Sequence, residues 1–110
     1  MKMYLDTSTP TTILKLDDKE YSWESGRDLA ENLLSFIHDK LKENNKDFKD
    51  LEEITFMSGP GSFTGLRIGA AVVNTLAGEL HIPLKDHHGE IKQIILPEYG
   101  RGANISAPRK

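Results

Sequence analysis

A glycine-rich segment at 57–69 joins a predicted buried strand to a predicted helix, where backbone groups could do chemistry. Gly59 and Gly61 permit backbone angles that other residues avoid, and Pro60 between them fixes its own φ. Backbone amides at a helix N-terminus favour anions, so such a loop could hold a phosphate group. Its spacing, however, matches neither the dinucleotide-binding Gly-x-Gly-x-x-Gly fingerprint nor the P-loop. We therefore favour a tight structural joint and keep phosphate binding as the alternative.

A second candidate is a short polar cluster, in which Asp86, His87, His88 and Glu90 provide four possible metal ligands within five residues. Adjacent histidines on an extended chain point to opposite sides, so they seldom bind one ion together. The sequence shows no distant second cluster that would complete such a site. We therefore expect no metal site here.

Nucleophilic catalysis finds little support in the sequence. Ser58 and Ser62 have no suitable base beside them, and the spacing from Ser62 to Gly65 is one residue too long for a Gly-x-Ser-x-Gly elbow. The chain also contains no cysteine, which excludes a thiolate nucleophile and a disulfide framework. We predict no catalytic residue and no cofactor.

Length and charge narrow the function further. A chain of 110 residues forms one domain with a modest core, and an activity that needs a cleft between two lobes would require a partner. The 14 basic and 17 acidic side chains give a net charge of −3, which argues against a principal nucleic-acid binder. No signal peptide or membrane-spanning run is evident, so we expect a cytoplasmic protein without membrane contact.

The first half of the chain reads as a small sheet followed by a helix. Alternating apolar residues predict strands at 3–5, 11–16 and 20–23, and turn signals between them predict an antiparallel meander. Helical spacing predicts an amphipathic helix at 27–44, and a short helical turn then leads into a strand at 54–57. The apolar face of that helix consists of Leu29, Leu33, Phe36, Ile37 and Leu41.

A second long helix, predicted at about 64–80, is apolar on most of its circumference. One stripe holds Leu66, Ala70, Val73, Ala77 and Leu80, and Ile68, Ala71, Val72 and Leu76 extend it. Such a helix must be covered on more than one side. The first helix could provide this cover within the monomer, but we favour a partner chain. Gly69 inside the helix costs about 1 kcal/mol relative to alanine, so we expect close packing against that partner.

The C-terminal part is too short for a second domain. Residues 85–110 contain one apolar run at 91–96, predicted as a strand, and then a mixture rich in proline, glycine and serine. We therefore divide the chain into a lobe at 1–84 and a strand with an extended tail at 85–110.

Four segments together carry a family resemblance. In their order and spacing along the chain, the four segments resemble those of TsaB (YeaZ-like) proteins, over roughly residues 1–84. They are Leu5–Thr9, Glu31–Leu34, Ser58–Gly69 and Ile82–Leu84. The most specific part is the family motif Ser58, Gly59, Pro60, Gly61, Ser62, Phe63, Thr64 and Gly65.

The resemblance implies a fold and a role. The fold would be α/β, a single actin-like or Hsp70-like (ribonuclease H-like) lobe whose mixed sheet carries an antiparallel β-meander and two long helices. The role would be that of a non-catalytic scaffold and activator that binds TsaD as a heterodimer. TsaD transfers the threonylcarbamoyl group to form threonylcarbamoyladenosine beside the anticodon of tRNA. TsaE would be a further partner, and tRNA would be met only indirectly.

The chain also departs from the family, because the second lobe of about a hundred residues is missing. The end at 96–108 is similar to the Pro-x-Tyr-x-Arg tails of full-length members, which suggests a natural minimal form with an internal deletion. Asp6 and the hydroxyl residues at 7–9 resemble the first phosphate loop of actin-like ATPases. Because the lobe that would close over a nucleotide is missing, we favour a local hydrogen-bonded turn.

The resemblance places the partner contact on the two helices. The residues expected to form it are Leu33, Ile37, Arg67, Ile68, Gly69, Ala71, Val72 and Thr75. Without its partner, the chain is expected to form a homodimer. Two alternatives stay open, namely a nucleotide-binding enzyme with an actin-like fold and a homodimeric interaction protein without a role in tRNA modification.

Overall fold

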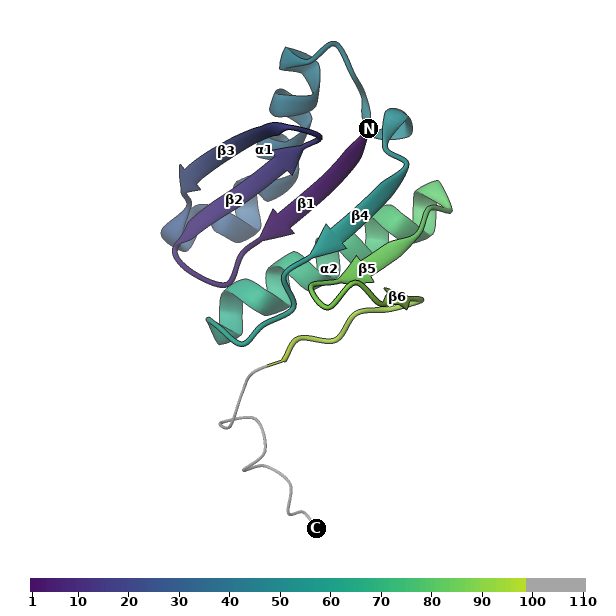
Figure 1. Cartoon of the computed structure of the whole chain (residues 1–110). Helices are drawn as coiled ribbons and strands as arrows, with labels where there is room; N and C mark the ends of the chain where they lie inside the picture. The colour runs from purple at the N-terminus through teal and green to yellow at the C-terminus, as the bar shows by residue number, and fades with distance from the viewer. Residues whose placement is uncertain (99–110) are drawn as a thin grey trace.

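In the computed structural model, residues 1–98 are described and form one mixed sheet with two long helices (Figure 1). The strands are β1 (Lys2–Asp6), β2 (Thr11–Leu16), β3 (Lys19–Glu24), β4 (Glu53–Phe56), β5 (Leu84–Asp86) and β6 (Ile91–Lys92). The helices are α1 (Leu29–Glu43) and α2 (Phe63–Leu80), with short 3-10 turns η1 (Gly26–Asp28) and η2 (Phe48–Asp50). None of the helices in this part of the chain has the length and apolar character needed to cross a membrane.

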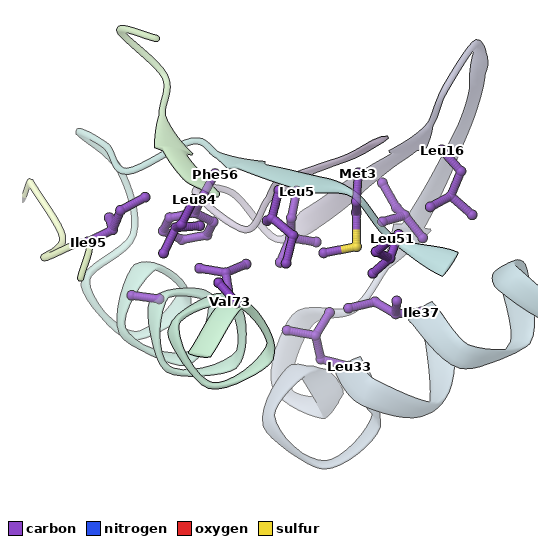
Figure 2. Close-up of a cluster of buried hydrophobic side chains, with 14 of the residues drawn as sticks. Met3, Leu5, Leu16, Leu33, Ile37, Leu51, Phe56, Val73, Leu84 and Ile95 are labelled. Atoms are coloured by element: carbon purple, nitrogen blue, oxygen red, sulfur yellow. The ribbon is translucent and has the colours of Figure 1, made fainter. Parts of the chain in front are cut away.

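The six strands lie in the order β3-β2-β1-β4-β5-β6. β1, β2 and β3 form the predicted antiparallel meander, in which Leu5 pairs with Leu14 and Leu14 with Tyr21. β4 and β5 run parallel to β1, and α2 is the crossover helix that connects β4 to β5. Both helices lie on one face of the sheet, as Figure 2 shows.

The core lies between this sheet face and the helices (Figure 2). Alternation along β1 buries Met3 and Leu5, and β4 contributes Phe56 in the same way. Leu33 and Ile37 point from α1 toward the sheet and are fully buried. The helical and strand periods predicted from the sequence are therefore confirmed for these elements.

The C-terminal elements differ from the prediction. β5 was not expected, and it crosses the predicted boundary at residue 84, so the sheet continues beyond it. The strand predicted at 91–96 is reduced to two residues, with Ile94 and Leu96 exposed and Ile95 buried. Asn74 explains this, because its side-chain amide binds both the N–H and the C=O of Ile95 in place of a neighbouring strand. The predicted extended tail falls largely at 99–110, outside the described residues.

Candidate functional site

The glycine-rich joint between β4 and α2 packs directly on the connection after β1. Ser62 caps α2, since its Oγ accepts a hydrogen bond from the Gly65 N–H at 3.2 Å, while its own N–H donates to the Ser8 carbonyl at 2.8 Å. A Cβ on Gly61 would come within 2.5 Å of the Ser8 side chain, and one on Gly65 within 2.2 Å of the Thr7 carbonyl. The joint and the connection after β1 therefore approach so closely that Gly61 and Gly65 have no space for a side chain.

Gly69 lies deeper in the same contact. A Cβ at this position would meet Thr7 Oγ1 at 2.2 Å and the Phe56 ring at 2.6 Å. The low helix propensity of Gly69 is therefore offset by packing inside the chain. This corrects the expectation that a partner provides the packing.

Asp6 makes a local turn. Its Oδ1 accepts hydrogen bonds from the Ser8 N–H at 2.8 Å and from Ser8 Oγ at 2.6 Å, as the turn interpretation predicts. The N–H groups of Ser62 and Gly65 at the start of α2 are also already bound within the chain. These two amides are not free to cradle a phosphate, which favours the structural interpretation of the joint.

An apolar strip runs along the outer face of α2 and continues onto Leu34 of α1. We define the outer strip by Ile68, Ala71, Val72 and Thr75 together with Leu34. Two shallow cavities follow it and share Ala71. One, of about 270 Å³, is lined by Thr64, Arg67, Ile68 and Ala71, and the other, of about 220 Å³, by Leu34, Ala71, Val72, Thr75 and Leu76.

The structure places the eight predicted partner residues in two groups. Leu33, Ile37 and Gly69 are buried in the chain's own core, so they offer no surface and must be removed from the predicted contact. Arg67, Ile68, Ala71, Val72 and Thr75 lie exposed or half-buried along α2.

Leu34 and Leu76, which line the second cavity, were not among the predicted partner residues. Leu34 is 50% exposed although it is a large apolar side chain. Leu34 lies one residue away from the buried stripe of α1, and this spacing was the signal in the sequence that could have identified it as a surface residue.

The polar cluster at 86–90 folds differently from the expectation. The two adjacent histidines lie on a turn, and their ring centroids are 3.9 Å apart, so they do not point to opposite sides. Asp86 Oδ1 holds the turn by accepting hydrogen bonds from the N–H groups of His88 and Glu90. Burial raises the pKa of Asp86, but these two N–H groups and Lys92 outweigh it and leave that pKa below its usual value.

Ser58 has a histidine neighbour that its sequence surroundings did not reveal. Its Oγ lies 2.8 Å from His87 Nδ1 and donates a hydrogen bond to Glu98 Oε2 at 3.2 Å. Either atom can be the donor between Ser58 Oγ and His87 Nδ1, and the same nitrogen accepts from the Ser58 N–H at 3.3 Å. Ser58 is buried, so its hydroxyl does not face solvent as an attacking nucleophile would.

Known proteins resemble this chain in sequence. Residues 23–88, more than half of the chain, match the family described as "TsaD: tRNA N6-adenosine threonylcarbamoyltransferase". The tRNA threonylcarbamoyladenosine biosynthesis protein TsaB of Buchnera aphidicola subsp. Baizongia pistaciae is 32% identical over 82 residues, which are 71% of this chain and 37% of that protein. The chain belongs to the TsaB (YeaZ-like) family. The TsaB protein of Bacillus subtilis is 42% identical over 48 residues, 44% of this chain and 21% of its own length.

Among solved structures, YeaZ from Pseudomonas aeruginosa superimposes with a TM-score of 0.68 at 32% sequence identity. The alignment covers 77% of this chain and 42% of that one. The mixed sheet with two helices thus has the actin-like, ribonuclease H-like fold of the YeaZ lobe. The chain spans less than two fifths of the length of these two curated TsaB relatives.

Proposed function

We propose that this chain is a non-catalytic subunit that binds TsaD and supports the formation of threonylcarbamoyladenosine on tRNA in the cytoplasm. Its relatives carry the name tRNA threonylcarbamoyladenosine biosynthesis protein TsaB. The observation that carries the proposal is the outer strip on α2 with Leu34 of α1, an apolar surface beside two shallow cavities.

The outer strip has the spacing of a helix face that packs on another protein. Ala71, Val72 and Thr75 lie three, four and seven residues after Ile68, so the four side chains form one continuous row. Arg67 extends the row at the N-terminal end of α2, and its guanidinium lies 5.4 Å from the centroid of the Phe63 ring. Arginine and aromatic residues are enriched in protein interfaces relative to the rest of the protein surface.

The test of the proposal is a reconstituted modification assay with tRNA, threonylcarbamoyl-adenylate and TsaD from the same organism. We expect TsaD alone to modify tRNA slowly and the added chain to raise the rate, because the chain would act as an activator. A rate that is the same with and without the chain would contradict the proposal. Adding TsaE to the mixture then tests whether it joins the complex.

Two further measurements distinguish the alternatives. Titration of the isolated chain with ATP and Mg²⁺ should give no turnover, whereas turnover would favour a nucleotide-binding enzyme. Light scattering at tens of micromolar should show a homodimer, because the outer strip on a second copy would provide the missing cover. A dimer that persists in the presence of TsaD, without exchanging a subunit for TsaD, would favour a homodimeric protein without a role in tRNA modification.

A further inference from the structure

We propose that His87, His88 and Glu98 form a binding site for a divalent transition-metal ion such as Zn²⁺. One ligand atom from each of the three side chains lies within 4.8 Å of the others. His88 Nε2 and Glu98 Oε2 are 3.7 Å apart, close to the roughly 3.3 Å expected between two ligands of a tetrahedral Zn²⁺ ion with bonds of about 2.0–2.1 Å. The two histidines follow the end of β5, and the site shares no residue with the outer strip on α2.

The turn after β5 brings the two histidines to one side of the chain. Asp86 Oδ1 fixes it through the N–H groups of His88 and Glu90, and Gly89 takes a φ of +85° that favours glycine. Because Asp86 is buried and accepts these bonds, it acts as the anchor of the turn and not as a fourth ligand. His87 is half-buried and His88 exposed, so an ion can reach the site from solvent.

Ser58 holds the ring of His87 through contacts with Nδ1. Ser58 Oγ lies 2.8 Å from His87 Nδ1, where either atom can be the donor, and it donates to Glu98 Oε2 at 3.2 Å. The Ser58 N–H also donates to Nδ1, at 3.3 Å. Binding of a cation through Nε2 therefore places the ring proton on Nδ1, where Ser58 Oγ can accept it.

The same residue holds Glu98 in place. The Glu98 N–H donates a hydrogen bond to the Ser58 carbonyl, in addition to the side-chain bond. Gly59 allows this approach, because a Cβ there would come within 2.0 Å of the Glu98 carbonyl. One buried serine therefore orients two of the three ligands, which is the function of outer-shell partners in metal sites.

The ligand set indicates the class of ion. Two imidazoles and one carboxylate suit Zn²⁺, Ni²⁺ or Co²⁺, whereas Mg²⁺ and Ca²⁺ prefer oxygen ligands alone. Three protein ligands leave a fourth position on a tetrahedral ion for water or another donor.

The experiment is calorimetric titration of the full chain, without a polyhistidine tag and after treatment with a chelator, with ZnCl₂. We expect saturable binding of one Zn²⁺ ion per chain and no binding of Mg²⁺ under the same conditions. His88→Ala and Glu98→Gln should each weaken Zn²⁺ affinity by at least about tenfold. His38→Ala, which removes a histidine on α1, is the matched control and should leave the affinity unchanged. Thermal melts of each variant without metal confirm that it is folded.

A second measurement tests the role of Ser58 independently of affinity. NMR of the Zn²⁺-loaded chain should show the His87 ring proton on Nδ1, and Ser58→Ala should weaken Zn²⁺ binding about 10–100-fold. Absence of saturable Zn²⁺ binding, or binding that His88→Ala and Glu98→Gln leave unchanged, would overturn the site. A proton on Nε2 of His87 in the Zn²⁺-loaded wild-type chain would overturn the arrangement of its ligands.

Discussion

Thr7 is the buried polar residue that ties β1 to the N-terminal turn of α2. Its Oγ1 donates a hydrogen bond to the Gly65 carbonyl at 2.7 Å, and the same atom faces the space where Gly69 has no side chain. Since the side chain is buried, no water can replace this bond.

Thr7→Val keeps the shape of the side chain and removes the donor. We expect the free energy of unfolding to fall by about 1–3 kcal/mol, because the Gly65 carbonyl loses its buried partner. Thr11→Val on β2 is the matched control, since the Thr11 hydroxyl is bound to Glu24 at the surface, and it should change stability by no more than about 0.5 kcal/mol. Urea unfolding of both variants measures the difference, and equal effects would contradict the role given to Thr7.

Asp47 contributes a pH-dependent cap before η2. The Phe48 N–H bound to its carboxylate lowers the pKa of Asp47, with help from Lys42 and against a smaller effect of burial. Because the folded pKa is lowered, the stability from this cap is fully present above the ordinary pKa of about 3.9 and is lost as the pH falls through the folded value.

Asp47→Asn tests this pH dependence, because asparagine is also a good N-cap but does not titrate. We expect wild type to be more stable than the variant at pH 7 and pH 5, and the difference to shrink at pH 3 and below. Denaturant unfolding at the three pH values gives the comparison. A difference that grows on acidification would show that the sign of the pKa shift is the opposite.

At the scale of elements, α2 uses its glycines in different ways. Gly69 faces Thr7 and Phe56 without space for a methyl group, whereas a Cβ on Gly78 would meet nothing within 4 Å. The same substitution in one helix should therefore have opposite effects.

Gly78→Ala should stabilise the chain by up to about 1 kcal/mol, since alanine has the better helix propensity and the site is open. Gly69→Ala should destabilise it, because overpacking costs about 1–3 kcal/mol and exceeds the gain in propensity. Thermal unfolding of the two variants measures both signs. Stabilisation by both would show that the contact between α2 and β1 can relax at little cost.

The elements that depend on local pattern could be predicted from the sequence. The meander and both helices have clear periods, and the joint has glycines whose need for close approach is visible in the residue types. β5 could not be predicted, because its three residues follow a proline and are a strand only through pairing with β4. The strand predicted for the apolar run at 91–96 was wrong in length, because Asn74 on α2 binds the backbone of Ile95.

The same distinction applies to the sites. The row on α2 was visible in the helical spacing. Which apolar residues are left for a partner depends on how α1 and the sheet pack, so Leu33 and Ile37, which lie in the core, were wrongly included in the partner contact. The approach of His87, His88 and Glu98 depends on a turn and on contacts with Ser58, which lies 29 residues before His87. Spacing along the chain does not encode such an approach.

At the scale of the whole molecule, the position of both helices on one sheet face decides which surface is left for a partner (Figure 2). The opposite face carries polar pairs, such as Lys85 with Glu53 at 3.2 Å and Lys15 over the Tyr4 ring. The outer strip on α2 and Leu34 is instead apolar and borders the core, with Leu34 and Ala71 exposed. The architecture thus presents a helical surface, as the proposed contact with TsaD requires.

Ala71 is the best position to test this contact. It is exposed and lines both cavities, whereas Val72 is partly buried against the core, so a charge at Val72 would also affect folding. Ser35→Glu is the matched control, because Ser35 is exposed on the side of α1 opposite to its buried face.

The most direct test is the affinity of TsaD for wild-type chain, Ala71→Glu and Ser35→Glu, measured by calorimetry alongside the melting temperature of each chain alone. We predict that Ala71→Glu weakens association by at least about tenfold, since a charge in a desolvated apolar contact is costly, while its melting temperature stays close to wild type. Ser35→Glu should bind as wild type does. If a folded Ala71→Glu chain binds TsaD with unchanged affinity, the outer strip is not the contact and the account is contradicted.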